Sequence, residues 1–197
     1  VADQIARLVK SGTKPGAIAI LYRENFQSRA LEEAMLAQGL PYRVLGTRFF
    51  ERKEVKDAIS YLRAALNPKS KADITRIIAT PPRGIGKTTL DKMFAGGDES
   101  LPPAARKKVA AFRAQLEAIS KAIAILPASE AVKFAIEASG MEKMLQDAGG
   151  DSSTPLGTSG KERLDNLREL VNFSARFDDA APPEVMERLI EEAALQR

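Results

Sequence analysis

Hydrophobic residues are arranged in two different ways along the chain, as a short continuous run and at helical spacing. Residues 17–22 (AIAILY) are apolar or aromatic throughout, and a short run of this kind is typical of a strand buried on both faces of a parallel sheet. Polar residues follow, and Ser28 then stands where a helix N-cap is expected, ahead of helically spaced apolar residues that end at Gly39. The pattern predicts a strand, a polar turn and a crossover helix.

A second strand is expected at residues 41–45 (PYRVL), and beyond residue 48 the apolar spacing is helical throughout. The further expected helices cover residues 2–10, 52–66, 72–79, 87–94, 104–126, 129–139, 141–148, 161–177 and 183–196. Phe49 and Phe50 are expected to anchor the core. Residues 149–160 consist almost entirely of loop formers, which favours disorder. The predicted fold class is mixed α/β and mostly α, with a small incomplete parallel α/β unit followed by an all-helical domain.

Composition limits the chemistry that the chain can perform. The 197 residues are 44% hydrophobic and 28% charged, as in ordinary soluble globular proteins. There is no cysteine and no histidine, so thiol chemistry, the commonest general base and the commonest transition-metal ligand are all missing. Independent catalysis is therefore not expected, and no cofactor or metal site is predicted within the chain. No apolar run approaches the roughly 18 residues of a membrane span, so no membrane partner is expected.

The positive charge is concentrated in one part of the chain. The net charge is +4, yet residues 48–92 alone carry 11 Lys and Arg against 5 Asp and Glu. A local basic excess is expected of a surface that binds phosphates. The alternative is a charged face that only contacts solvent.

A glycine-rich turn lies within this basic segment. Two glycines around one apolar residue allow a tight turn whose backbone can approach a phosphate, and the amides and positive dipole end of the following helix can face the same anion. The apolar residue is expected to pin the turn to the core, while the others add charge and hydroxyl groups at its rim. The predicted duplex-binding residues are Arg83, Gly84, Ile85, Gly86, Lys87, Thr88 and Thr89. The arrangement resembles a helix-hairpin-helix, which binds the DNA backbone without reading sequence; the alternative is an ordinary tight turn.

A second candidate site follows the first expected strand, at the edge where ligands bind in open α/β sheets. Guanidinium, amide and hydroxyl groups can bind phosphate or sugar oxygens without reading bases. The predicted single-strand DNA-binding residues are Tyr22, Arg23, Asn25, Gln27, Ser28 and Arg29. The alternative is a core tyrosine beside a surface arginine that pairs with Glu32 or Glu33.

These motifs together resemble the accessory region of UvrD/Rep/PcrA-type superfamily-1 DNA helicases. The turn matches the family pattern YR-x-N-x-Q-S-R, and TPPRGIGKTTLDKM follows it in the family's order and spacing. The resemblance implies that residues 1–46 are part of the 2A motor domain and that residues 47–197 form the accessory 2B domain, with the crossing at Gly46. It also implies that the first site faces a single-stranded track.

The chain is expected to be a fragment of a larger motor. It begins with Val rather than Met, and it lacks a G-x-x-x-x-G-K-[ST] phosphate loop and an acidic magnesium motif. The resemblance implies a parent helicase that unwinds DNA 3′-to-5′ with ATP and Mg²⁺, in the cytoplasm at the bacterial nucleoid, with repair or replication proteins as partners. Two alternatives stay open: a stand-alone DNA-binding module, and a protein-interaction or autoregulatory module without motor activity.

Overall fold

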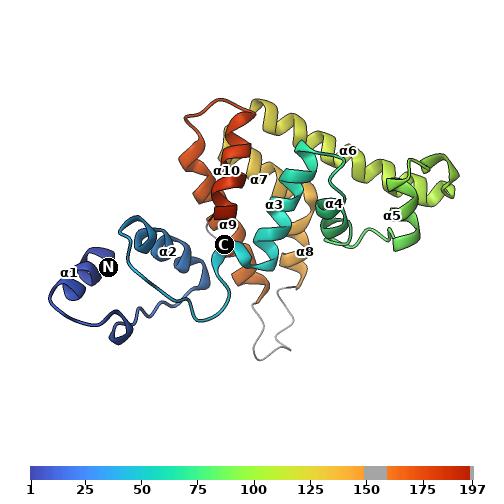
Figure 1. Cartoon of the computed structure of the whole chain (residues 1–197). Helices are drawn as coiled ribbons and strands as arrows, with labels where there is room; N and C mark the ends of the chain where they lie inside the picture. The colour runs from blue at the N-terminus through green and yellow to red at the C-terminus, as the bar shows by residue number, and fades with distance from the viewer. Residues whose placement is uncertain (149–158, 196–197) are drawn as a thin grey trace.

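The computed structural model of the chain describes residues 1–148 and 159–195, and these residues are mostly helical (Figure 1). The α-helices are α1 (Ala2–Lys10), α2 (Ser28–Ala37), α3 (Lys53–Leu66), α4 (Lys71–Ile77), α5 (Lys87–Phe94), α6 (Pro103–Ile125), α7 (Ala128–Ser139), α8 (Met141–Asp147), α9 (Gly160–Ser174) and α10 (Glu184–Leu195). Short 3₁₀ turns are η1 (Pro15–Ala17), η2 (Asn25–Gln27), η3 (Phe49–Glu51), η4 (Asp98–Ser100) and η6 (Ala175–Phe177). Each expected helix has a counterpart, so the prediction of a mostly helical chain is confirmed. The expected disorder at 149–160 lies almost entirely outside the described residues.

Neither expected strand forms, and the mixed α/β class is wrong for the part of the chain that the structure describes. Residues 17–22 and 41–45 contain no strand, and neither do the other described residues. Leu21 is 93% exposed and Leu45 is 86% exposed, so neither run is buried as expected. An apolar run supplies side chains to bury, but a strand also requires a neighbouring strand for its backbone hydrogen bonds. The described residues provide no such neighbour.

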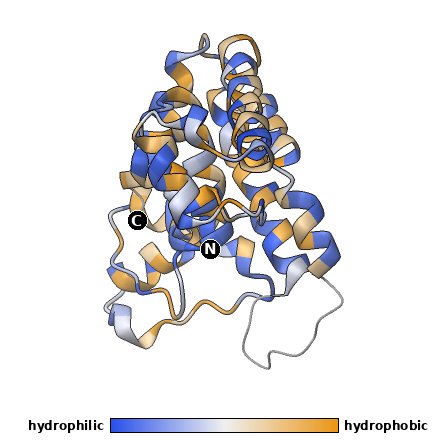
Figure 2. Ribbon diagram, turned by 90° about the vertical axis from the view of Figure 1, so that its right-hand side faces the viewer, coloured by the Kyte–Doolittle hydropathy of each residue, from blue (hydrophilic) through white to orange (hydrophobic). Residues whose placement is uncertain are grey.

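Two separate hydrophobic clusters divide the described residues into two lobes. The N-terminal lobe (residues 1–46) has a small cluster around Ala2, Ile5 and Met35. The helical lobe (residues 47–148 and 159–195) has a much larger cluster, to which α3 to α10 contribute. Figure 1 shows α1 and α2 projecting from the helical lobe, and Figure 2 shows hydrophobic residues on the helix faces that pack together.

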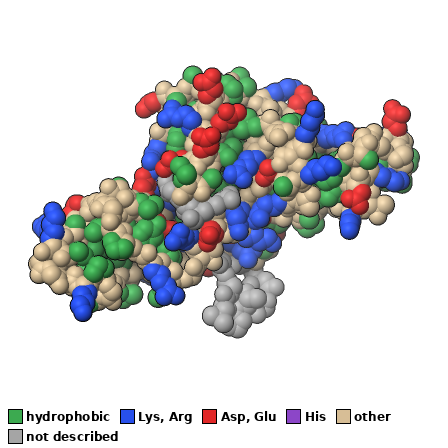
Figure 3. Space-filling view, in the orientation of Figure 1, with side chains coloured by type: hydrophobic (Ala, Val, Ile, Leu, Met, Phe, Trp, Pro, Cys, Tyr) green, Lys and Arg blue, Asp and Glu red, His purple; other side chains and the backbone are tan. Residues whose placement is uncertain are grey.

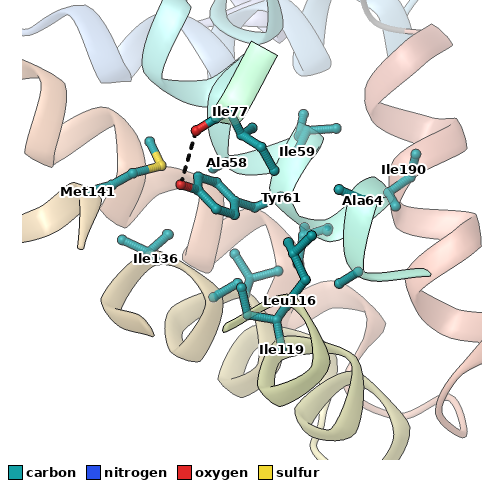
Figure 4. Packing of buried hydrophobic residues seen from close by; sticks show 14 of the residues in the cluster. Ala58, Ile59, Tyr61, Ala64, Ile77, Leu116, Ile119, Ile136, Met141 and Ile190 are labelled. Carbon is teal, nitrogen blue, oxygen red and sulfur yellow. Dashed lines mark hydrogen bonds between the residues drawn. The ribbon is translucent and has the colours of Figure 1, made fainter. Parts of the chain in front are cut away.

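Helix α3 lies at the centre of the helical lobe and packs against α4, α6, α7 and α9. Its apolar residues recur at helical spacing, and Val55, Ile59 and Leu62 are at most 1% exposed. Figure 4 shows Tyr61 of α3 among side chains from α4, α6, α7 and α8. The sequence pattern of α3 thus makes it the helix around which the others assemble.

Four phenylalanines form a chain of edge-to-face rings that ties the start of the helical lobe to α9. Ring centroids are 5.0 Å apart for Phe49 and Phe50, 5.1 Å for Phe50 and Phe173, and 5.5 Å for Phe173 and Phe177. Such pairs are stabilising beyond the area that they bury. The expected core anchor at Phe49 and Phe50 is confirmed, since both are at most 2% exposed.

We expect backbone amides of residues 18–21 to exchange hydrogen faster than the amide of Phe112. The first segment is irregular and partly exposed, whereas Phe112 is 2% exposed in the middle of α6. Amides in irregular, exposed segments open with little free energy, whereas core helices approach the global limit. Hydrogen–deuterium exchange read by NMR measures both in one sample. Equal protection in a monomeric sample would contradict the expectation.

Candidate nucleic-acid interface

The turn of the first candidate site, residues 22–29, lies at the junction of the two lobes. It contains η2, which packs against α9 (Figure 1). The Asn25 side chain donates a hydrogen bond from Nδ2 to Oε1 of Glu162, at 3.3 Å. Glu162 itself forms a reciprocal capping box with Ser159 at the start of α9. The first turn of α9 therefore contacts the N-terminal lobe through Glu162.

Gln27 shapes this turn from within. Its Oε1 accepts hydrogen bonds from the backbone amides of Arg23, at 3.2 Å, and Glu24, at 3.1 Å. The Glu24 side chain caps η2 in return, which gives a reciprocal capping box. The Gln27 carbonyl is thus engaged with the backbone of its own turn.

Ser28 does not cap a helix as expected. It is the first residue of α2, is 1% exposed, and accepts a hydrogen bond at its Oγ from Nη2 of Arg52, at 2.8 Å. Arg52 also donates from Nη1 to Oδ1 of Asn166, at 2.7 Å. The capping prediction failed because an arginine 24 positions away in sequence reaches the hydroxyl. This buried chain of polar contacts links α2, the N-cap residue of α3 and α9.

Arg29 joins the same two lobes by ion pairs. Its side chain is 11% exposed and contacts Glu33 at 2.7 Å and Glu169 through Nε. Its guanidinium carbon lies 5.4 Å from the centre of the Phe173 ring. The cation is therefore engaged between α2 and α9.

Tyr22, Arg23, Asn25 and Gln27 are the exposed residues of the first site, and of these the side chains of Tyr22 and Arg23 are not engaged in the hydrogen bonds described above. Tyr22 is 38% exposed, and the Arg23 side chain is 93% exposed, with its Nε 3.9 Å from Glu24. An exposed pair at this distance adds little to stability. The guanidinium is accordingly accessible to an external anion.

Burial perturbs two ionisable groups beneath this turn. Burial raises the pKa of Glu32, and bonds from Ser28 and the Phe49 backbone together with the charges of Arg52 and Arg48 oppose that rise. Burial lowers the pKa of Arg52, against the attraction of Glu32 and other acidic groups. Both shifts have the sign expected when a charge is removed from water. The charges of Glu32 and Arg52 thus attract each other beneath the site, and burial disfavours the charged form of each.

The second candidate site is the turn between α4 and α5. Ile85 is 8% exposed and packs in the main hydrophobic cluster, so it pins the turn to the core as expected. Gly84 has a φ of +63°, which favours glycine. Gly86 differs, because its φ is −85° and its ψ is 174°, an extended conformation that any residue adopts. The tight turn therefore requires glycine at position 84 and not at position 86.

Side chains around this turn divide into outward and inward groups. Lys87 and Thr88 are exposed and Thr89 is half-buried, all in the first turn of α5. Lys108 of α6 also reaches the turn, and its Nζ lies 3.3 Å from the carbonyl oxygen of Gly84. Sequence reasoning missed Lys108, although the basic run at residues 106–108 was a visible signal. Arg83, in contrast, turns inward.

The two candidate sites lie apart. Figure 1 places the first beside α9, where the lobes meet, and the second beside α5, toward the opposite end of the molecule from α1. Figure 3 shows hydrophobic side chains gathered on the N-terminal lobe, and Lys and Arg side chains spread over both lobes. The chain therefore presents two separate sets of polar groups rather than one cleft.

The described residues offer no group of three or more His, Cys, Asp or Glu side chains suited to a metal ion. Among the helices of residues 1–148 and 159–195, none has the length and apolar character needed to cross a membrane.

Comparisons with known proteins give one family. The model of the UvrD-like helicase C-terminal domain matches residues 1–197. DNA helicase II of Haemophilus influenzae is 35% identical over 194 residues, which cover 90% of this chain and 26% of that protein. DNA helicase II of Escherichia coli is 34% identical with the same coverage. ATP-dependent DNA helicase PcrA of Bacillus subtilis is 47% identical over 95 residues, 47% of this chain and 13% of that protein. The chain thus spans about a quarter of the length of the first two relatives.

Proposed function

Because this chain belongs to the family of UvrD-like helicase C-terminal domains, we propose that it is part of an ATP-dependent helicase that unwinds DNA 3′-to-5′. The family resemblance and the names of the relatives support this proposal. Its setting would be DNA repair or replication in the bacterial cytoplasm at the nucleoid, with proteins of those processes as partners.

Within the parent, residues 1–46 would belong to the 2A motor domain and residues 47–197 would form the 2B accessory domain. The separation of the two hydrophobic clusters supports a boundary there. The positive φ of Gly46, +115°, supports a turn at the crossing. The exposed Leu21 and Leu45 fit a lobe whose extended segments pair with strands from the rest of the parent.

ATP and Mg²⁺ would be bound by other parts of the parent. The sequence has no G-x-x-x-x-G-K-[ST] loop, so the cradle of amides that holds nucleotide phosphates is missing. The described acidic residues do not form a group suited to a metal ion. The residues present therefore do not fit either group, and this chain would contribute contacts to DNA rather than the hydrolytic step.

The turn between α4 and α5 would bind the phosphate backbone of duplex DNA. The observation that carries this proposal is the outward placement of Gly84, Gly86, Lys87 and Thr88 directly before and at the N-terminus of α5. The first amides and the dipole of a helix attract anions, and lysine and hydroxyl groups add charge-assisted contacts. Lys108 extends the same surface from α6. These donors would bind phosphates, which carry no base identity.

The turn at residues 22–29 would face the single-stranded track mainly through Tyr22 and Arg23. Their exposure supports this role, because an aromatic ring can stack on a base and a guanidinium can pair with a phosphate. Asn25, Gln27 and Arg29 would hold the turn in position through the contacts described above.

We expect the chain to bind duplex DNA weakly and without sequence preference, with a dissociation constant of roughly 10⁻⁴–10⁻⁶ M. Lys87→Ala should reduce the salt slope by about one unit and weaken all sequences alike, because one phosphate contact is lost. Fluorescence anisotropy of short duplexes at several salt concentrations measures both quantities.

Lys121→Ala is the matched control. Lys121 is a 74% exposed lysine in the last third of α6, paired with Glu117 at 2.7 Å, and its loss should leave the slope unchanged. If Lys87→Ala and Lys121→Ala gave the same slope as the unaltered chain while duplex binding persisted, the DNA surface would lie away from the turn.

A further inference from the structure

We propose that Arg83 is a positioning residue: it holds the turn before α5 on the helical core and thereby sets how the backbone of Gly84 and Gly86 meets a duplex. The part of this inference that concerns DNA rests on the function proposed above. The part that concerns the turn rests on the contacts of Arg83 alone.

The Arg83 guanidinium donates hydrogen bonds to five oxygen atoms on separate segments. Nη1 donates to the carbonyl oxygens of Ile77, at 3.2 Å, and Pro81, at 2.7 Å; Nη2 donates to Oη of Tyr61, at 2.5 Å, to Oε1 of Gln115, at 2.9 Å, and to the carbonyl oxygen of Ser139, at 3.0 Å. These atoms belong to α3, the end of α4, the following turn, α6 and the end of α7. One side chain thus ties the turn to four helices.

Two aromatic rings flank the same guanidinium. Its central carbon lies 5.6 Å from the ring centre of Tyr61 and 5.3 Å from that of Phe112. A planar guanidinium stacks on rings while its edges donate hydrogen bonds, whereas a lysine ammonium is a point charge with three donors. The site is therefore shaped for arginine rather than for any cation.

Tyr61 gives Arg83 a fixed acceptor. The Tyr61 ring is fully buried, and its hydroxyl lies 2.5 Å from the carbonyl oxygen of Thr80. The same hydroxyl lies 3.4 Å from the carbonyl oxygen of Ile77 (Figure 4). Burial raises the pKa of this hydroxyl to about 12, although Arg83 opposes the rise. The hydroxyl is therefore protonated at neutral pH and donates to the turn while it accepts from Arg83.

The end of α7 completes the site. Gln115 accepts from Arg83 and donates from Nε2 to the carbonyl oxygen of Ala138, at 2.5 Å, next to the Ser139 carbonyl that Arg83 contacts. The last carbonyls of a helix carry the negative end of its dipole, which stabilises a cation. All five acceptors are neutral, so these contacts do not cancel the charge of Arg83, and its field still reaches the turn.

The inward path of Arg83 places Gly84 at the surface. A Cβ at Gly84 would lie 2.6 Å from Nζ of Lys108, so backbone and lysine are in close contact there. The Arg83 guanidinium thus positions the exposed amides of Gly84 and Gly86 by holding the turn in place, and it does not contact a ligand itself.

The test is Arg83→Lys, which keeps the charge and loses the planar fork. We expect the amides of Gly84 and Gly86 to exchange hydrogen about tenfold faster, while the amide of Phe112 is unchanged. Duplex affinity should fall about tenfold at every salt concentration with an unchanged salt slope, since a loss of about 1.4 kcal/mol is tenfold in affinity. Lys87→Ala should give the opposite pattern, with a smaller salt slope of duplex binding and unchanged hydrogen exchange at the amides of Gly84 and Gly86.

Tyr61→Phe is the second variant, since it keeps the buried ring and removes only the hydroxyl. It should accelerate exchange at Gly84 in the same direction but less than Arg83→Lys, which keeps the inference testable if the lysine variant does not fold. Unchanged hydrogen exchange at the amides of Gly84 and Gly86 in both variants would overturn the inference. A salt slope reduced by one unit in Arg83→Gln, with unchanged hydrogen exchange at the glycine amides, would also overturn the inference. Arg83 would then contact a phosphate itself. Faster glycine exchange in a chain that never binds DNA would support the positioning of the turn and refute the proposed function instead.

Discussion

Phe173→Ala is expected to lower the free energy of unfolding of the chain by about 3–5 kcal/mol, the range for removing a buried aromatic side chain. Phe173 is 0% exposed and lies between the rings of Phe50 and Phe177. The guanidinium groups of Arg29 and Arg176 lie 5.4 Å and 5.2 Å from its ring centre. The substitution therefore leaves a cavity and removes the ring on which two ion-paired arginines rest.

Urea denaturation followed by circular dichroism measures this loss. Phe134→Ala is the matched control, because Phe134 lies on α7 and is 36% exposed. It should cost about 1 kcal/mol or less, as substitutions away from the core do. Equal losses in the two variants would contradict the central place of Phe173.

Arg52→Ala is expected to cost about 3–5 kcal/mol at neutral pH, the range for removing one partner from a buried set of charges. The change removes the donors that Arg52 gives to Ser28 and Asn166, and it removes the attraction of Arg52 for the buried Glu32. Arg23→Ala is the control, since that side chain is 93% exposed and its loss should change stability by about 0.5 kcal/mol at most.

The loss in Arg52→Ala should also depend on pH. The folded-state pKa of Glu32 is raised above its ordinary value by burial, so the folded chain binds this proton more tightly than the unfolded chain. The stability that Glu32 contributes therefore falls as pH rises from the pKa of the unfolded chain through the pKa of the folded chain. Without Arg52 the pKa should rise further, so the variant should recover part of its stability at pH 5.5 relative to pH 7.5.

Urea denaturation at the two pH values measures that recovery. Adding Glu32→Gln, which cannot ionise, should abolish the difference contributed by this group. A loss in Arg52→Ala that is the same at both pH values would contradict the involvement of Glu32.

The helices could be predicted from sequence because their signal is local. Apolar spacing in α3 and α6 and the breakers between helices are properties of neighbouring residues, and the observed ends lie close to the expected ones. Phe49 and Phe50 were expected in the core for the same reason, because hydrophobic residues before a helix pack against its apolar face.

The failures involve partners that are distant in sequence. The strand at residues 17–22 was inferred from side chains, yet a strand depends on a neighbour that the described residues do not provide. The local sequence predicts Ser28 as a helix cap, but its contact with Arg52, which also binds Asn166, decides its role. Arg83 was expected at the rim of its turn, and its inward contacts with Gln115 and Ser139 link positions 32 and 56 residues away. No local pattern contains such pairings.

The division into two hydrophobic clusters gives the chain a mechanically weak joint. The clusters have no residue in common, and the lobes are linked by short polar contacts such as those of Arg29 and Arg52. Hydrogen bonds break within a fraction of an ångström, whereas a packed core resists deformation as a unit. A pulling force applied between the ends of the two lobes is therefore concentrated on these few contacts. Under tension these contacts are expected to give way before the packed core of the helical lobe does, so the joint determines where the chain first yields.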